Sequence, residues 1–240
     1  MIKLDILAFG AHPDDVEISC SGTLIKHVAA GYKVGVIDLT RGELGTRGSV
    51  AIRDEECQLA STIMGIHARE NLNLADGFFE INEASKMKVV QVIRKYRPSI
   101  VLANTLDDRH PDHGRAAKLV AESAFLAGLR KINSQDELGN DQEAWRPKAV
   151  YHYVQDWQLK PDFIVDITGF TDKRMESLLA YKSQFYNPNS KEPETPISSQ
   201  AFLNMIVYRS LEMGRIIGAE HGEAFKIHRP IGVRHLMDLL

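Results

Sequence analysis

The sequence is short of cysteine, of excess positive charge and of long apolar runs, and each shortage excludes a class of protein. Its 240 residues include 29 lysines and arginines against 32 aspartates and glutamates, for a formal net charge of −3. A general nucleic-acid binder usually carries a basic field, so no nucleic-acid partner is expected. No apolar run approaches the roughly 20 residues of a membrane span, and the first residues indicate a strand rather than a signal peptide. We therefore expect no membrane span.

The two cysteines, Cys20 and Cys57, occur within helical patterns among apolar neighbours. Thiols in such surroundings are usually buried and reduced, as in proteins of the cytoplasm. The pattern predicts a cytoplasmic protein in which neither thiol is catalytic.

The phosphate-binding signatures of nucleotide sites are also missing. A dinucleotide site needs glycines after its first strand, so that the pyrophosphate can approach the backbone and a helix N-terminus. Here residues 10–15 are Gly-Ala-His-Pro-Asp-Asp, and no Walker lysine follows. Because two carboxylates stand where phosphates would lie, this turn favours a cation over a nucleotide.

Strand and helix patterns alternate along the first two-thirds of the chain. Strands are expected over 4–10, 33–40, 71–74, 99–105, 149–154, 163–168 and 224–228, and helices over 16–30, 50–64, 82–96, 114–129, 171–185 and 199–217. Such alternation is typical of parallel sheets with right-handed crossovers. The sequence predicts an α/β, Rossmann-like fold, with a mainly parallel sheet flanked by helices, and one domain over 1–240.

Two clusters of polar side chains follow strand patterns that are far apart in the sequence. Residues 12–15 are His-Pro-Asp-Asp, and residues 110–113 are His-Pro-Asp-His. Open α/β sheets bind ligands beyond the carboxyl ends of their strands, where the strand order reverses. If the order is the common 3-2-1-4-5, the two clusters face each other. They are predicted to form one divided active site.

The side chains of the two clusters indicate a metal site. Two histidines and one aspartate suit Zn²⁺, which takes three protein ligands at a catalytic site and keeps a position for water. Fe²⁺ accepts the same ligands. The pKa of bound water falls to about 7, a spare carboxylate can take its proton, and a spare histidine can assist the leaving group. Spacing alone leaves open which aspartate and which later histidine bind the metal.

The clusters and their surroundings closely resemble those of the LmbE-like (PIG-L) N-acetylglucosaminyl deacetylases. The resemblance rests on residues 12–15, Glu17, Gly22, residues 40–43, Arg53, Glu56 and residues 110–113, and it extends at least to residue 129. Within the family, the sequence is most similar to the bacterial branch that acts on N-acetylglucosaminyl malate in bacillithiol biosynthesis. The resemblance also implies a homo-oligomer, for instance a hexamer.

Carried over by position, the resemblance assigns a role to each residue of the clusters. It implies three zinc ligands, which are His12, Asp15 and His113. Asp14 becomes the general base, and His110 stabilises the oxyanion or protonates the amine. Asp112 is expected to accept a hydrogen bond from His110 and to favour its cationic form.

Arginines near the strand ends suggest how a substrate is held. A guanidinium fork suits the carboxylates of an anionic group such as malate, so Arg53 and Arg109 are expected to bind substrate. The alternative for Arg53 is a surface salt bridge with Glu56, one helical turn later.

The sequence thus predicts a zinc-dependent hydrolase that removes acetyl from an N-acetylglucosaminyl substrate, with the L-malate conjugate as the expected one. The alternatives are a deacetylase of another conjugate or oligosaccharide, and a non-catalytic metal-binding or sugar-binding relative. A metallophosphoesterase generally needs two metals and more carboxylates. The aglycone, the metal used in the cell and the oligomeric state stay open, as do the roles of Arg41, Arg47, Tyr186 and the loop over 187–200.

Overall fold

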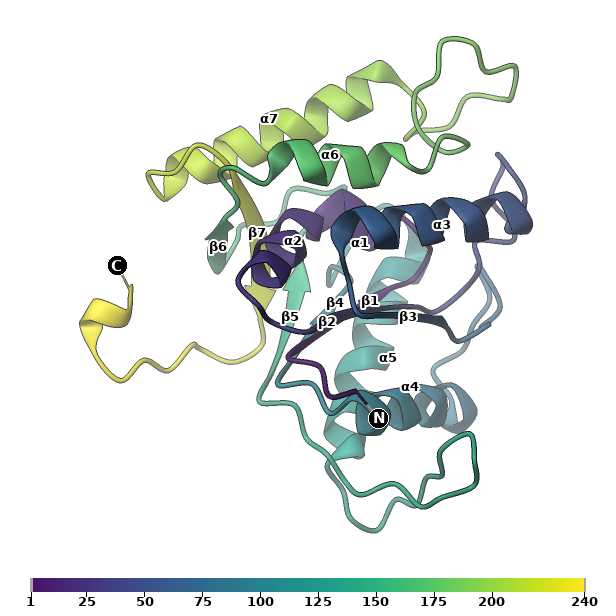
Figure 1. Cartoon of the computed structure of the whole chain (residues 1–240), viewed down its shortest axis with the longest axis vertical. Helices are drawn as coiled ribbons and strands as arrows, with labels where there is room; N and C mark the ends of the chain where they lie inside the picture. The colour runs from purple at the N-terminus through teal and green to yellow at the C-terminus, as the bar shows by residue number, and fades with distance from the viewer. Residues whose placement is uncertain (1, 240) are drawn as a thin grey trace.

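The computed structural model describes residues 2–239, and within them seven strands form one mixed sheet (Figure 1). The strands are β1 (Ile6–Gly10), β2 (Val34–Asp38), β3 (Ala68–Asn71), β4 (Ile100–Ala103), β5 (Ala149–Tyr153), β6 (Phe163–Asp166) and β7 (Gly222–Ile227). They lie in the order β3-β2-β1-β4-β5-β7-β6, and β7 runs antiparallel to both of its neighbours. The predicted mainly parallel sheet and its 3-2-1-4-5 order are confirmed.

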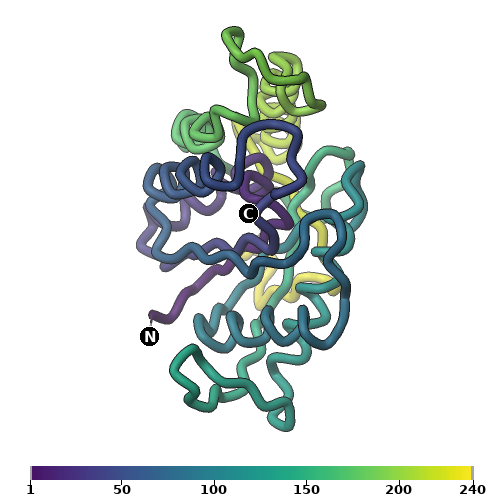
Figure 2. Tube along the Cα trace, turned by 90° about the vertical axis from the view of Figure 1, so that its right-hand side faces the viewer, coloured from purple at the N-terminus to yellow at the C-terminus, as the bar shows by residue number. Residues whose placement is uncertain are grey.

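Helices cover both faces of this sheet. They are α1 (Asp15–Ser19), α2 (Ser21–Ala29), α3 (Val50–Met64), α4 (Glu83–Tyr96), α5 (Pro111–Ala127), α6 (Thr171–Leu179) and α7 (Gln200–Ile216), followed by the short 3-10 helix η1 (Leu236–Leu239). In Figure 1, α4 and α5 lie below the sheet, and α1, α2 and α3 lie above it. Helices α6 and α7 form an outer layer over them, as Figure 2 shows from the side. The predicted α/β class is confirmed.

The central strand β1 shows how the sheet is buried. Leu7 and Phe9 pack toward α4 and α5, whereas Ile6 and Ala8 pack toward α2. Because successive side chains of a strand point to opposite faces, a strand covered on both sides is apolar at every position. The polar residues therefore begin only where β1 ends, which places the first cluster at the carboxyl edge of the sheet.

The two helices that lie next to the clusters differ from the sequence prediction. The helix expected over 16–30 divides at Cys20 into α1 and α2. The helix expected from 114 begins already at Pro111. Proline suits the first helical position because its missing N–H would have no partner there. The second cluster therefore straddles the start of α5.

The strand expected over 71–74 lies instead over Ala68–Asn71. Leu72 and Leu74 are buried, which produced the apolar pattern, but their amides bond to carbonyl groups at and beyond the end of β2. Burial in a loop and burial in a strand give similar short apolar patterns.

The N-terminus of α2 is held by the last strand of the sheet. Glu223 of β7 accepts hydrogen bonds from the backbone N–H groups of Gly22 (3.0 Å) and Thr23 (2.7 Å). The buried Arg174 of α6 places Nε 3.0 Å from the same carboxylate. A Cβ atom on Gly22 would lie 2.9 Å from Glu223, so this close approach requires glycine. The helix that follows the first cluster thus depends on residues 200 positions later in the chain.

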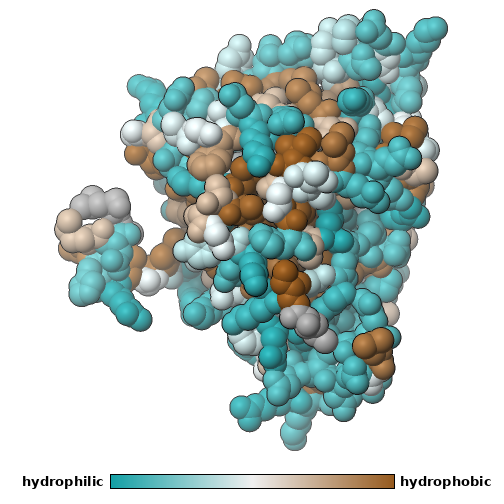
Figure 3. Space-filling model, viewed as in Figure 1, coloured by the Kyte–Doolittle hydropathy of each residue, from teal (hydrophilic) through white to brown (hydrophobic). Residues whose placement is uncertain are grey.

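After β7 the chain leaves the body of the molecule. Figures 1 and 3 show the last segment, which ends in η1, extending to one side. Leu236 and Met237 of η1 are exposed. No helix within residues 2–239 is long and apolar enough to cross a membrane.

Candidate active site

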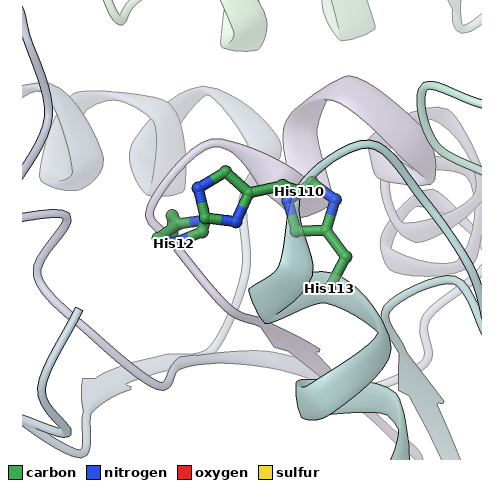
Figure 4. A group of neighbouring side chains, drawn as sticks. All are labelled: His12, His110 and His113. Carbon is green, nitrogen blue, oxygen red and sulfur yellow. The ribbon is translucent and has the colours of Figure 1, made fainter. Parts of the chain in front are cut away.

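The two polar clusters meet at the carboxyl ends of β1 and β4. These strands pair in parallel, so the loops that follow them lie side by side. Figure 4 shows the three histidines of the clusters close together beside the start of α5. The ring centroid of His12 lies 4.6 Å from that of His110 and 5.7 Å from that of His113. The sheet thus brings together side chains that are about a hundred positions apart in the sequence, as the switch-point geometry requires.

Asp15 lies between two of these imidazoles. Its carboxylate is 3.1 Å from Nε2 of His113 and 3.6 Å from Nδ1 of His12. Asn104 and Gln155 donate hydrogen bonds to the same carboxylate at 2.9 and 3.1 Å. Burial alone would raise the pKa of Asp15, but the two histidines hold it well below its usual range. Asp15 is therefore a buried, ionised group in a fixed orientation.

Each of these two histidines presents its other nitrogen to a further carboxylate. Nδ1 of His113 lies 2.5 Å from Asp108, which also accepts from the backbone of Trp157. Nε2 of His12 lies 3.1 Å from Asp76. Burial would lower the pKa of His113, but Asp15 and Asp108 raise it to about 9. An imidazole held by an outer carboxylate, with its free nitrogen facing inward, is the usual arrangement of a metal ligand.

The donor atoms therefore fit a metal ion, although more than one set is available. The expected set of His12, Asp15 and His113 offers two nitrogens and one carboxylate, which suits Zn²⁺ or Fe²⁺. Two groups, neither of them the expected set, have ligand atoms within 4.8 Å of one another: His12, His110 and His113, and His12, Asp76 and Asp112. His12 belongs to all of these sets; its Nδ1 faces Asp15, whereas its Nε2 faces Asp76 and Asp112.

Sequence reasoning missed Asp76 and Asp108. Asp76 follows β3, so it reaches the same edge of the sheet as the two clusters. Asp108 lies just ahead of the second cluster, and its acidic side chain in a loop after a strand was a signal that could have been used. Each carboxylate contacts a histidine of a cluster from a separate loop, and a search for ligand spacing within one stretch of sequence does not detect such contacts.

Asp14 lies apart from the imidazoles, against an arginine. It is 4% exposed, and its backbone has a φ of 116°, in the region that few residues other than glycine adopt. Its carboxylate lies 3.1 Å from Nη2 of Arg53, which also donates to the backbone carbonyl of Pro13. Burial raises the pKa of Asp14 to about 7, against the opposing charge of Arg53. A carboxylate with this environment can both hold and release a proton near neutral pH.

The expected hydrogen bond from His110 to the Asp112 carboxylate is wrong. The contact between these residues runs the other way, because the backbone N–H of Asp112 donates to Nδ1 of His110 at 3.2 Å. The Asp112 carboxylate instead lies 3.4 Å from Nε2 of His12 and 2.6 Å from Arg115, and it accepts from the Gly77 N–H. His110 caps the N-terminus of α5 in place of a serine or aspartate.

His110 is also not biased toward its cationic form as expected. Burial and the nearby His12 and His113 lower its pKa below the ordinary value, and these effects exceed the opposing one of Asp112. His110 nevertheless lines the same cavity as Asp14 and Asp15.

A cavity of about 460 Å³ opens over these residues. Its polar wall holds the two clusters together with Arg53, Arg109, Gln155 and Arg209, and its apolar wall holds Ile18, Leu44, Phe78, Ile197, Phe202 and Met205. The volume matches a small-molecule site that is mostly apolar with a few placed polar groups. Both arginines expected to contact substrate line it, but the guanidinium of Arg53 already binds Asp14, and that of Arg109 binds Asp156 at 2.8 Å.

The loop before α7 forms one side of the cavity mouth. Its residues Thr195, Pro196 and Ile197 line the cavity, whereas Tyr186 does not. Arg47 holds the loop in place by donating to Ser190 at 2.6 Å. Arg41 lies outside the cavity and pairs with Asp54. Arg47 therefore supports the cavity wall without reaching into it.

Comparison with known proteins agrees with the architecture of this site. Residues 7–124 match the family described as GlcNAc-PI de-N-acetylase (PIG-L), a segment that contains both clusters. The diacetylchitobiose deacetylase of Thermococcus kodakarensis is 30% identical over 190 residues, which cover 75% of this chain and 70% of the relative. A probable N-acetyl-alpha-D-glucosaminyl L-malate deacetylase 2 of Bacillus anthracis is 25% identical over 203 residues, covering 75% of this chain and 81% of the relative.

Among solved structures, a conserved protein of Thermus thermophilus superposes with a TM-score of 0.85 at 32% identity. The match covers 97% of this chain and 98% of that protein, so it extends over the C-terminal half that the family match leaves out. Fold, clusters and relatives agree, and the chain belongs to the PIG-L (LmbE-like) family of deacetylases.

Proposed function

We propose that this chain is a metal-dependent N-deacetylase that removes acetyl from an N-acetylglucosaminyl conjugate. One observation carries the proposal: Asp15 lies between two imidazoles that are each backed by a carboxylate, whereas Asp14 pairs with Arg53 and, within residues 2–239, makes no hydrogen bond or ion pair with either ring. A site that only bound a metal would need no such spare carboxylate. We assign His12, Asp15 and His113 as the residues that would hold zinc, with Fe²⁺ as the alternative. A metal bound there supplies a Lewis acid that polarises the amide and activates water.

The chain's own residues supply the proton transfers. Asp14 takes a proton from the attacking water as oxygen bonds to the acetyl carbon, and Arg53 keeps its carboxylate in position. The C–N bond then breaks, and the leaving amine takes up a proton. His110, which lines the same cavity, donates to the developing oxyanion or to that amine. The Asp112 carboxylate lies 3.4 Å from Nε2 of His12 and holds the ring of His12 in its orientation.

For the substrate we propose N-acetylglucosaminyl L-malate, an intermediate of bacillithiol biosynthesis. One relative is named for activity on this conjugate and another for activity on diacetylchitobiose, so an oligosaccharide is the alternative. Arginine in the cavity supports an acidic aglycone, because guanidinium groups bind carboxylates with paired hydrogen bonds. Arg109 is the proposed contact, together with Arg53 if a substrate oxygen shares the guanidinium that binds Asp14.

The proposal also covers the domain organisation, the oligomeric state and the location of the protein. We propose one domain over residues 1–240, and a homo-oligomer such as a hexamer. The thiols of Cys20 and Cys57 are free, which supports the proposed cytoplasmic location.

The direct test combines metal analysis with amine release. The purified protein is assayed on N-acetylglucosaminyl malate, diacetylchitobiose and free N-acetylglucosamine, and phosphate release from a phosphomonoester serves as the control. We expect about one metal per chain and amine release that is fastest with the malate conjugate. No amine release from any of the three by the metal-loaded protein contradicts the deacetylase, and faster release from diacetylchitobiose contradicts the proposed aglycone.

A further inference from the structure

Arg209 is a charged residue on the apolar face of α7. Phe202, Met205 and Ile206 lie on the same face of the helix, since positions three, four and seven apart share one side. Phe202 and Ile206 are buried in the layer between α3, α6 and α7. A leucine or methionine would continue this face, yet position 209 holds an arginine that lines the active-site cavity.

The guanidinium of Arg209 makes few bonds for a half-buried group. Its Nη2 donates to the backbone carbonyl of Asp156 at 2.7 Å. Within residues 2–239, no carboxylate oxygen lies within the 4.0 Å of an ion pair with it. By contrast, Arg94 has no carboxylate partner either, but all three of its nitrogens donate to carbonyl or hydroxyl oxygens at 2.7–3.0 Å. Every guanidinium nitrogen of Arg94 thus has an acceptor in the protein, whereas among residues 2–239 only Nη2 of Arg209 has one.

The acidic groups around Arg209 are already engaged elsewhere. The carboxylate of Asp156 binds Nε of Arg109 at 2.8 Å, and that of Asp108 binds His113 and the Trp157 N–H. Glu212, on the same helix, accepts from Gln158. Burial lowers the pKa of Arg209, which reflects the cost of keeping this charge away from water. A buried charge of this kind is stabilised mainly by a partner of opposite sign.

Arg109 brings a second positive charge to the same wall. Arg109 binds the side chain of Asp156 while Arg209 binds its backbone, so one residue joins the two guanidinium groups. The wall therefore carries two guanidinium groups beside the Asp156 carboxylate, while Asp108 and Glu212, the other acidic groups that act on Arg209, are bound to His113 and Gln158, and both arginines line the cavity. The acetamido group of the substrate is neutral, so a negative charge that fits this wall comes from the aglycone or from the acetate product.

We propose that Arg209 is the specificity residue of this site and binds a carboxylate on the aglycone of the substrate, with Arg109 beside it. This inference rests on the proposed deacetylase function and names the substrate class as N-acetylated amino sugars with an acidic aglycone. It places an arginine of the C-terminal third beside Arg109 in the role first expected of Arg53, whose guanidinium holds Asp14. The sequence signal for this role was an arginine that interrupts the apolar face of a helix.

The test compares two substrates that share one skeleton, one charged and one neutral at the aglycone: N-acetylglucosaminyl L-malate and its dimethyl ester. Wild-type protein, Arg209→Met and Arg209→Lys are compared with Arg215→Met as the matched control, because Arg215 lies on the same helix but is exposed and outside the cavity. For the wild type we expect kcat/KM at least about tenfold higher for the diacid, as charge-assisted hydrogen bonds of a guanidinium imply.

Arg209→Met is expected to lower kcat/KM for the diacid about tenfold or more, chiefly through KM, and to change that for the diester less than about twofold. Arg209→Lys should keep part of the preference because it keeps the charge but loses the fork, and it covers the case in which the methionine variant does not fold. Arg215→Met should match the wild type. Equal losses on both substrates would overturn the proposal, since they indicate a structural role.

Binding supplies a readout that does not depend on turnover. Calorimetric titration with glucosaminyl malate, the deacetylated product, is expected to show about tenfold weaker binding to Arg209→Met than to wild type. An effect on acetate inhibition alone, with the diacid preference intact, would assign Arg209 to the product and overturn the aglycone assignment. If the wild type cleaves neither these substrates nor diacetylchitobiose nor free N-acetylglucosamine, the deacetylase proposal fails, while weaker binding of glucosaminyl malate to Arg209→Met than to wild type would still support Arg209 as the carboxylate site.

Discussion

Asp14→Asn separates proton transfer from metal binding in this site. The substitution keeps the size of the side chain, and asparagine tolerates positive φ better than most residues, so the loop should persist at the 116° of Asp14. Arg53 keeps the backbone carbonyl of Pro13 as a partner. Neither His12 nor His113 contacts Asp14 by a hydrogen bond or ion pair within residues 2–239, so the metal content should be unchanged. The loss is that of a general base, a rate factor of roughly 10²–10⁴, or about 3–5 kcal/mol in the barrier.

The assay is amine release under single-turnover conditions, with metal content measured on the same samples. Asp15→Asn is the matched comparison, because Asp15 contacts both His12 and His113 and its replacement should lower metal affinity. If Asp14→Asn loses its metal, or if excess zinc restores its activity, the two carboxylates have been assigned in reverse. Wild-type activity in a metal-loaded Asp14→Asn protein would falsify the assignment of Asp14 as the general base.

Three further predictions concern the metal and the fold. Removal of metal by a chelator should abolish deacetylation and Zn²⁺ or Fe²⁺ should restore it, whereas full activity in demonstrably metal-free protein would contradict the site. Gly22→Ala should lower the free energy of unfolding in urea by about 1–3 kcal/mol, because its Cβ would meet Glu223; an unchanged denaturation midpoint would contradict this contact. His152 is fully buried, Nδ1 faces the Asn104 carbonyl, and burial lowers its pKa to about 4. Between pH 6.5 and 4 the unfolded chain binds a proton there that the native protein does not, so stability should fall by about 3 kcal/mol as the pH drops through this window. His152→Asn should remove that loss of stability. If the stability of the variant depends on pH in the same way as that of the wild type, the role of His152 is contradicted.

Local patterns were sufficient for most of the fold because the central strands are covered on both faces. Apolar runs without alternation marked β1 and β4, and glycine after an apolar helix marked the end of α3. The predictions fail where tertiary packing overrides the local pattern. The helix expected over 171–185 ends at Leu179, yet Tyr181 and Phe185 stay fully buried in turns under α7. The apolar spacing of these two residues reflects their burial and does not show that the backbone there is helical.

The site was predictable to the extent that its residues lie next to each other in sequence. The meeting of the two clusters followed from strand order alone. Groups that act through another residue, such as Asp76 and Asp108, leave no spacing pattern because each comes from its own loop. The same limit applies to the partner of Arg53, since its pairing with Asp14 depends on how α3 crosses the sheet edge.

The contact between Glu223 and the start of α2 bears on how the protein is made. A ribosome releases the first polar cluster, residues 12–15, early, but the carboxylate that caps α2 emerges some 200 residues later. Until then, the amides of Gly22 and Thr23 lack their acceptor, and Arg174 lacks its counter-ion. The nascent chain can therefore form its central strands while the N-terminus of α2 still lacks its cap. A fragment that ends at residue 124, where the family match stops, would carry every proposed metal ligand without the carboxylate that caps α2.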